Sequence, residues 1–153
     1  MRRVVLDSNG VDPLIDLPGA YEVARAAVTA GRLELLFTHV TVNEIGATPD
    51  PCRRSRLLGV LVDLGCGVPT GAFALDVSEL DHAALSDSVD AVEALRSTSI
   101  RHTRDALIAT AALVQPCALV TNERRLRNRA RERGIEVLGT IELLSEFGFT
   151  QPA

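Results

Sequence analysis

The stretch that decides the fold is Val4-Val5-Leu6-Asp7-Ser8-Asn9-Gly10, an apolar run near the N-terminus that breaks abruptly into polar residues. Unbroken aliphatic runs are typical of strands buried on both faces of a parallel sheet. We therefore predict a central strand followed by a turn at Ser8, Asn9 and Gly10. Asp7 then stands at the carboxyl end of the strand, where open α/β sheets bind ligands. As an alternative, Asp7 only starts a turn or caps the next helix.

Strand-like and helical segments alternate along the rest of the chain. Further strands are predicted over Leu33–Phe37, Ala118–Val120 and Ile135–Leu138, with a weak one at Cys66–Val68. Helical segments are predicted between them, over Asp12–Leu17, Pro18–Gly31, Val40–Gly46, Arg53–Leu64, Thr103–Val114, Arg124–Arg133 and Thr140–Gly148. This alternation is typical of an α/β fold with a parallel sheet. Because no repeat or boundary interrupts it, we predict one domain over residues 1–153.

Composition narrows the class of protein. The chain is 46% hydrophobic, which is enough for a packed core, and its net charge is −4. No apolar run approaches the roughly 20 residues of a membrane span, and no signal-peptide pattern is present, so we expect a cytoplasmic protein without a membrane segment. The three cysteines lack the spacing of metal ligands, which argues against structural zinc; they are Cys52, Cys66 and Cys117.

Four acidic residues occupy positions that the surrounding pattern does not explain. Asp7 and Glu123 follow strands, Glu44 lies in an apolar helical segment, and Asp105 opens a helix that is apolar almost all round. Each has an ordinary structural alternative. Asp105 would complement a helix dipole, Glu123 would pair with Arg127, and Glu44 would face solvent. Because carboxyl ends of parallel strands share one edge of a sheet, we expect the four acids to converge.

Converging acids need compensation. Two carboxylates about 5 Å apart repel by roughly 3 kcal/mol at an effective dielectric constant of about 20. Such a cluster must bind protons or hold a cation. Carboxylate oxygens in a chain with few histidines and no thiol motif select a hard ion, Mg²⁺ or Mn²⁺. Ions of this kind are suited to the hydrolysis of phosphodiester bonds.

Four short motifs resemble, in order and spacing, those of the PIN-domain ribonuclease family. They are Leu6-Asp7-Ser8-Asn9, Val42-Asn43-Glu44-Ile45, Arg104-Asp105-Ala106-Leu107-Ile108-Ala109 and Val120-Thr121-Asn122-Glu123. The resemblance spans nearly the whole chain. It implies a three-layer α/β/α fold with a central parallel sheet, an acidic metal site, and Mg²⁺- or Mn²⁺-dependent cleavage of RNA. For compact members it further implies a VapC-like toxin that forms a homodimer and is inhibited by an antitoxin protein.

The site that follows from the chemistry and the resemblance is acidic. Catalytic and metal-binding roles are predicted for Asp7, Glu44, Asp105 and Glu123. Glu123 stands where the family most often has Asp, and its extra methylene adds about 1.5 Å, enough to change the metal geometry or to make the contact water-mediated. Supporting roles, in which a side chain orients a water or phosphate, are predicted for Ser8, Thr121 and Asn122.

A basic helix follows Glu123 directly. Its six arginines are Arg124, Arg125, Arg127, Arg129, Arg131 and Arg133. A solvated surface helix explains most charge runs, but this one begins beside a predicted site acid, which favours phosphate binding. We predict RNA contacts from Arg104, Arg124, Arg125 and Arg127. Sparse aromatic residues argue against extensive base stacking.

Rival functions differ in what they need. Phosphoaspartyl enzymes also use an Asp at the first strand end, but they require a lysine, and this chain has none. The haloacid-dehalogenase pattern also needs a second Asp where this chain has Asn9. The remaining alternative is a PIN-like module that binds RNA or protein with weak or no catalysis. The segment Arg53–Leu64 offers a surface for dimerisation.

Overall fold

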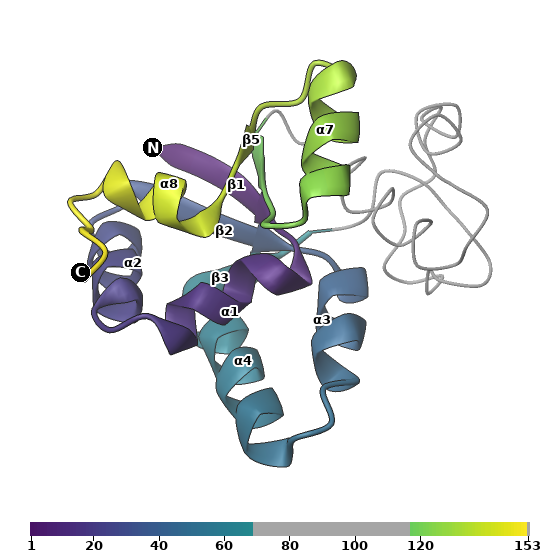
Figure 1. Cartoon of the computed structure of the whole chain (residues 1–153). Helices are drawn as coiled ribbons and strands as arrows, with labels where there is room; N and C mark the ends of the chain where they lie inside the picture. The colour runs from purple at the N-terminus through teal and green to yellow at the C-terminus, as the bar shows by residue number, and fades with distance from the viewer. Residues whose placement is uncertain (69–116, 153) are drawn as a thin grey trace.

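The computed structural model describes residues 1–68 and 117–152, which form a five-stranded parallel sheet with six helices (Figure 1). The strands are β1 (Arg2–Leu6), β2 (Leu33–Phe37), β3 (Gly65–Gly67), β4 (Ala118–Val120) and β5 (Val137–Leu138). The helices are α1 (Ser8–Asp16), α2 (Ala20–Thr29), α3 (His39–Gly46), α4 (Pro51–Leu64), α7 (Arg124–Glu132) and α8 (Thr140–Ser145). The predicted α/β fold with a central parallel sheet is confirmed.

Strand β1 lies in the middle of the sheet, as predicted. The strand order is β3-β2-β1-β4-β5, and every pairing is parallel. From β1 the chain builds outward through β2 to β3, and it returns to the other side of β1 with β4 and β5. The order therefore reverses between β1 and β4. In open α/β sheets the carboxyl ends of the strands at such a reversal are where ligands bind.

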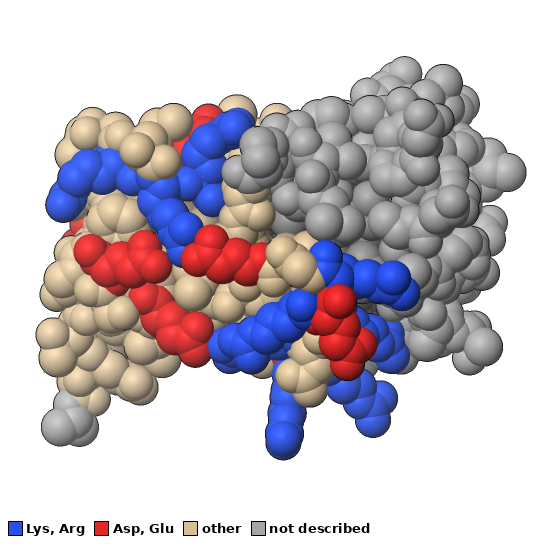
Figure 2. All heavy atoms as spheres, turned by 90° about the horizontal axis from the view of Figure 1, so that it is seen from above, with Lys and Arg blue, Asp and Glu red and all other residues tan. Residues whose placement is uncertain are grey.

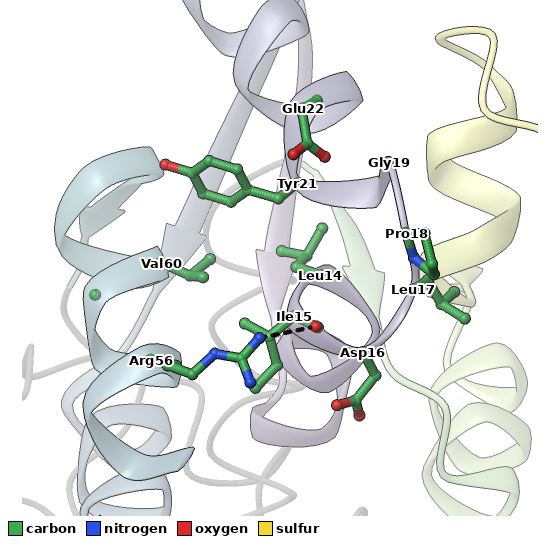
Figure 3. Close-up of a pocket in the computed structure, with 11 residues that line it drawn as sticks. Leu14, Ile15, Asp16, Leu17, Pro18, Gly19, Tyr21, Glu22, Arg56 and Val60 are labelled. Atoms are coloured by element: carbon green, nitrogen blue, oxygen red, sulfur yellow. Dashed lines mark hydrogen bonds between the residues drawn. The ribbon is translucent and has the colours of Figure 1, made fainter. Parts of the chain in front are cut away.

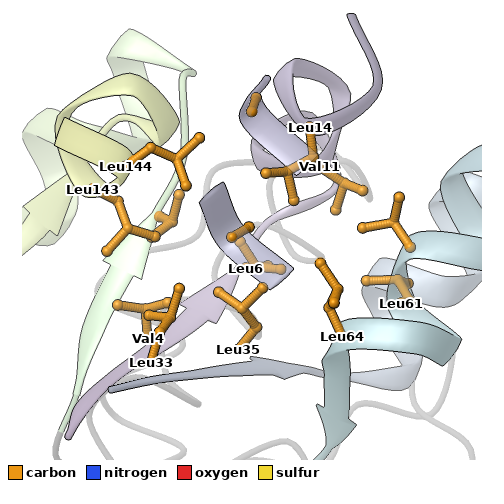
Figure 4. Close-up of a cluster of buried hydrophobic side chains, with 14 of the residues drawn as sticks. Val4, Leu6, Val11, Leu14, Leu33, Leu35, Leu61, Leu64, Leu143 and Leu144 are labelled. Carbon is orange, nitrogen blue, oxygen red and sulfur yellow. The ribbon is translucent and has the colours of Figure 1, made fainter. Parts of the chain in front are cut away.

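Both faces of the sheet are buried, which explains the unbroken apolar run in β1. On one face Val4 and Leu6 join a cluster with Leu14 of α1, Leu61 of α4 and Leu144 of α8 (Figure 4). On the opposite face, three strand residues are at most 1% exposed, namely Val5, Leu36 and Leu119. Burial of side chains this size stabilises a fold by about 1.5–3 kcal/mol each.

The segment after Asp7 differs from the prediction. Ser8, Asn9 and Gly10 were predicted as a turn, but they form the first turn of α1, which continues through Pro13 to Asp16. The separate helical turn predicted from Asp12 is part of this same helix. The physical reason is that the Asp7 side chain accepts a hydrogen bond from the Ser8 amide, which caps the helix immediately after the strand.

Other elements agree with the predictions apart from their ends. Helix α2 begins at Ala20 rather than Pro18, because Gly19 adopts the left-handed conformation with φ 82°. The predicted helix Thr103–Val114 lies outside the described residues. Among the described helices, none is both long enough and apolar enough to span a membrane.

Candidate active site

The Asp7 side chain links the carboxyl ends of β1 and β4, the two strands between which the strand order reverses. It follows β1 directly, and only 1% of its surface is exposed. The Ser8 amide donates a hydrogen bond to its Oδ1 over 2.7 Å, and the Thr121 hydroxyl donates one to its Oδ2 over 2.8 Å. Thr121 follows β4, so this bond ties the two strands together. Each carboxylate oxygen receives one of these donors and retains further acceptor capacity.

The surroundings of Asp7 are negative. The pKa of Asp7 is raised from 3.8 to about 6, chiefly by burial and in part by the charges of Glu44 and Glu123, against the hydrogen bonds from Thr121 and Ser8. No ion pair between described residues includes any of these three acids. An ionised Asp7 is thus left without a compensating side-chain cation in the described part of the chain, a condition that favours the binding of a cation.

Glu44 reaches the site through Ser8. The Ser8 hydroxyl donates to Glu44 Oε2 over 2.6 Å and lies 3.5 Å from Asp7 Oδ1. A hydroxyl carries one proton, so the shorter contact fixes it on Glu44. Helix α3, which carries Glu44, is anchored to the end of β1 by Thr41, whose hydroxyl donates to the Leu6 carbonyl over 3.0 Å. Glu44 therefore does not simply face solvent.

Glu123 enters the same region from β4. It is half-buried at the start of α7, and its side chain makes no capping hydrogen bond there. Its backbone amide donates to the Thr121 hydroxyl over 3.1 Å, which fixes the turn after β4. Arg127, the alternative partner for this side chain, pairs instead with Glu142 at 2.8 Å. The Glu123 carboxylate thus makes no ion pair among the described residues.

A polar network holds the turn after β4 against the start of α1. The Asn122 amide N–H donates to Asn9 Oδ1 over 2.9 Å, and Asn122 Nδ2 donates to the Asn9 carbonyl over 3.0 Å. Thr140 donates through its backbone amide to Asn122 Oδ1 over 3.2 Å and through its hydroxyl to the Gly10 carbonyl over 2.7 Å. The Asn9 carbonyl accepts from Asn122 because Pro13, four residues on, has no N–H to donate.

Sequence reasoning missed Asn9, Thr41 and Thr140 as parts of this arrangement. Pro13 was the available signal for Asn9, because a proline inside a helix leaves the carbonyl four residues earlier without its usual donor. Thr41 and Thr140 carried no such signal. Their partners lie 35 and 130 residues away in the sequence.

The described residues do not contain a complete metal site. Asp105 and Arg104 lie outside them, and among the residues that are described no group of three or more His, Cys, Asp or Glu side chains could hold a metal ion. The structure brings three of the predicted acids together. Glu44 accepts a hydrogen bond from Ser8, the residue after Asp7, and Glu123 lies close enough for its charge to raise the pKa of Asp7. A donor set made of carboxylate oxygens fits a hard divalent ion.

Two of the predicted RNA contacts line a polar cavity. This cavity measures about 390 Å³, and its lining residues are Asn122, Arg124, Arg127, Asn128 and Arg131. Arg125 is exposed on the same helix but does not line it. Figure 2 shows arginine side chains gathered on this side of the molecule, with acidic side chains between them.

A larger cavity lies at the other end of α1 (Figure 3). It measures about 500 Å³ and is bounded by Leu14, Tyr21 and Val60, with Arg56 at its side donating to the Ile15 carbonyl over 3.2 Å. None of the predicted site residues lines it. The nine residues of α1 span about 13 Å, so this cavity is separated from Asp7 by the length of the helix.

Comparison with solved structures finds the same fold. A PilT N-terminus (PIN) domain protein from the archaeon Sulfolobus solfataricus P2 matches with a TM-score of 0.55 and 12% identity, over 99% of this chain and 98% of that chain. A domain of a functionally unknown protein from Methanocaldococcus jannaschii matches with a TM-score of 0.49 and 13% identity, over 91% of each chain. Neither a family model nor a curated protein matches the sequence. The fold is PIN-like, and the likeness extends to the fold alone.

Proposed function

We propose that this chain is a metal-dependent ribonuclease with Asp7 at the centre of its active site. The observation that carries the proposal is the placement of Asp7: a buried carboxylate at the strand reversal, fixed by two hydrogen bonds, with the charges of Glu44 and Glu123 acting on it. The PIN-like fold supports a nuclease, since PIN domains are generally nucleases.

The acidic residues would hold Mg²⁺ or Mn²⁺. We assign this role to Asp7, Glu44, Asp105 and Glu123. When bound, an ion of this kind supplies an activated water and stabilises negative charge on the leaving oxygen of a phosphodiester. The remaining residues position the acids: Ser8 orients Glu44, and Thr121 orients Asp7.

The proposed substrate and partners rest on the order of the sequence motifs. RNA would be held by Arg104, Arg124, Arg125 and Arg127, and the chain would act as the toxin of a toxin–antitoxin pair. The proposed homodimer would use α4, where Val62 is an exposed apolar residue, with 85% of its surface accessible.

The test is cleavage of a labelled RNA with Mg²⁺ or Mn²⁺, with EDTA as the metal-free control. We expect metal-dependent cleavage by the wild type and a loss of about 100-fold or more in Asp7→Asn, since metal catalysis contributes several kcal/mol. The matched control is Asp63→Asn, the same change at an exposed carboxylate on α4 that accepts a hydrogen bond from Tyr21. Circular dichroism verifies that each variant is folded.

The second candidate is a PIN-like module that binds RNA or protein without cutting. The observation that favours it is the cavity lined by Arg124, Arg127 and Arg131, which suits nucleic-acid binding with or without catalysis. RNA binding by the wild type without cleavage in either metal would support this function and contradict the nuclease.

A further inference from the structure

We propose that the cavity lined by Asn122, Arg124, Arg127, Asn128 and Arg131 binds a backbone phosphate of the nucleic-acid strand, an inference that rests on the proposed function. Every lining residue is polar or charged, so the cavity suits a hydrophilic ligand. Its volume of about 390 Å³ is within the range of small-ligand sites.

The cavity is built by one face of α7. Arg124, Arg127, Asn128 and Arg131 are spaced at i, i+3, i+4 and i+7, which places them along one stripe of a helix. The buried residues Leu126 and Ala130 lie on another face and dock the helix on the core. The four residues of the stripe therefore lie together on a face of α7 that does not pack against the core.

Arg127 is held in place before any ligand arrives. Its Nη2 donates to Glu142 Oε1 over 2.8 Å, and the other Glu142 oxygen accepts from the Gly139 amide over 3.1 Å. These contacts, together with the charge of Arg131, hold the pKa of Glu142 below its usual value, so the pair stays ionised. Arg127 Nε is buried and has no hydrogen-bond partner in the described part of the chain.

The lining carries more positive charge than ion pairs with the described carboxylates neutralise. Of its three arginines, only Arg127 pairs with a carboxylate among the described residues. Neither Arg131 nor Arg124 forms an ion pair with a described residue, and Arg131 Nη2 lies 3.5 Å from the Val137 carbonyl. Guanidinium groups donate hydrogen bonds in a fork that fits phosphate oxygens, so a phosphate is the favoured anion.

The position of the cavity joins it to the acidic site. Asn122 belongs to the lining, and its chain neighbour Thr121 donates to Asp7 Oδ2. Adjacent Cα atoms are about 3.8 Å apart, so the cavity begins beside the residue that orients Asp7. On this proposal, a strand with one phosphodiester at Asp7 would place another phosphate in the cavity.

The experiment measures RNA binding by fluorescence anisotropy, with Asp7→Asn in every protein and EDTA present, so that no strand is cut. We expect Arg124→Ala and Arg131→Ala each to weaken binding about fivefold to tenfold, and to lower the salt dependence by about one phosphate contact. The loss should be equal for two RNAs of different sequence, because phosphate contacts carry no sequence information. Arg25→Ala on α2 removes an exposed arginine outside the cavity as a matched control.

Arg129→Ala, at a residue of α7 that is not among the proposed RNA contacts, separates the effect of the cavity from the effect of the helix's overall charge. It removes the same charge from α7 at a position outside the lining, so we expect a smaller loss than for Arg131→Ala. Equal losses at the two positions would overturn the cavity as a defined site. Failure to bind RNA at all would overturn it too. The cleavage assay, in which Asp7 is unsubstituted, tests the nuclease separately. If the wild type cleaves RNA but Arg131→Ala does not weaken RNA binding, the phosphate site is wrong and the nuclease still stands.

Discussion

Asp7 serves two purposes with a single carboxylate. One oxygen caps α1 by accepting from the Ser8 amide, and the other is tied to Thr121 across the strand reversal. The structural alternative for this residue, a helix cap, is therefore correct, but it does not explain the negative surroundings. A cap alone does not require burial to 1% exposure beside the charges of Glu44 and Glu123.

The raised pKa of Asp7 predicts a specific dependence of stability on pH in the metal-free protein. The folded state binds a proton on Asp7 up to about pH 6, whereas the unfolded chain releases it near 3.8. The free energy of unfolding of the wild type should therefore fall, as the pH rises through this window, relative to that of Asp7→Asn. Above pH 6 the variant should be more stable by up to about 3 kcal/mol.

The measurement is urea unfolding in EDTA at pH 4, 6 and 8. Comparing the two proteins removes the titration of the carboxylates that do not interact with Asp7, since both proteins carry them unchanged. An asparagine caps a helix about as well as an aspartate, and the Thr121 hydroxyl has a second acceptor in Asn9 Oδ1 at 3.1 Å. A difference that stays constant across this range would contradict the raised pKa.

At the scale of elements, α1 lies unusually close to β4. A Cβ added at Gly10 would stand 2.9 Å from the Val120 carbonyl oxygen, a backbone atom that cannot move aside. We expect Gly10→Ala to lower the free energy of unfolding by about 1–3 kcal/mol, because overpacking outweighs the better helix propensity of alanine. Denaturant unfolding measures the change.

Gly59 on α4 provides the matched control. A Cβ there meets no heavy atom within 4 Å, so Gly59→Ala should stabilise the protein by about 0.4–1 kcal/mol. If Gly10→Ala had the same effect on the free energy of unfolding as Gly59→Ala, the inferred close contact between α1 and β4 would be contradicted.

The elements differ in how far the sequence could predict them. The aliphatic run Val4–Leu6 gave the central strand, because burial on both faces admits only such residues. Residues Ser8–Gly10 favour turns in isolation. They are helical here because Asp7 caps the helix and because Asn122 donates a hydrogen bond to the Asn9 carbonyl, which Pro13 leaves without its usual helical donor. Such contacts between distant segments leave no local pattern. The proximity of Glu44 to Asp7 was expected, because the acids were predicted to converge, whereas the hydrogen bond from the Ser8 hydroxyl to Glu44 was not.

At the scale of the whole molecule, the strand order places the candidate chemistry. The reversal between β1 and β4 brings Asp7, near one end of the chain, beside the turn Thr121–Glu123, more than 100 residues away. The net charge of −4 gives no hint of a nucleic-acid surface. The positive charge is concentrated in the arginine stripe of α7, which begins directly after Glu123. Residues that attract phosphate therefore lie next to the acidic residues.

The central claim is that the acids around Asp7 hold a divalent ion, and isothermal titration with Mn²⁺ tests it most directly. We predict saturable binding by the wild type, with a gain in stability of about 2.7 kcal/mol at a hundredfold excess over Kd, and loss of both in Asp7→Asn. Asp63→Asn should bind as the wild type does. Equal Mn²⁺ binding by wild type and Asp7→Asn, or none by either folded protein, would contradict the account.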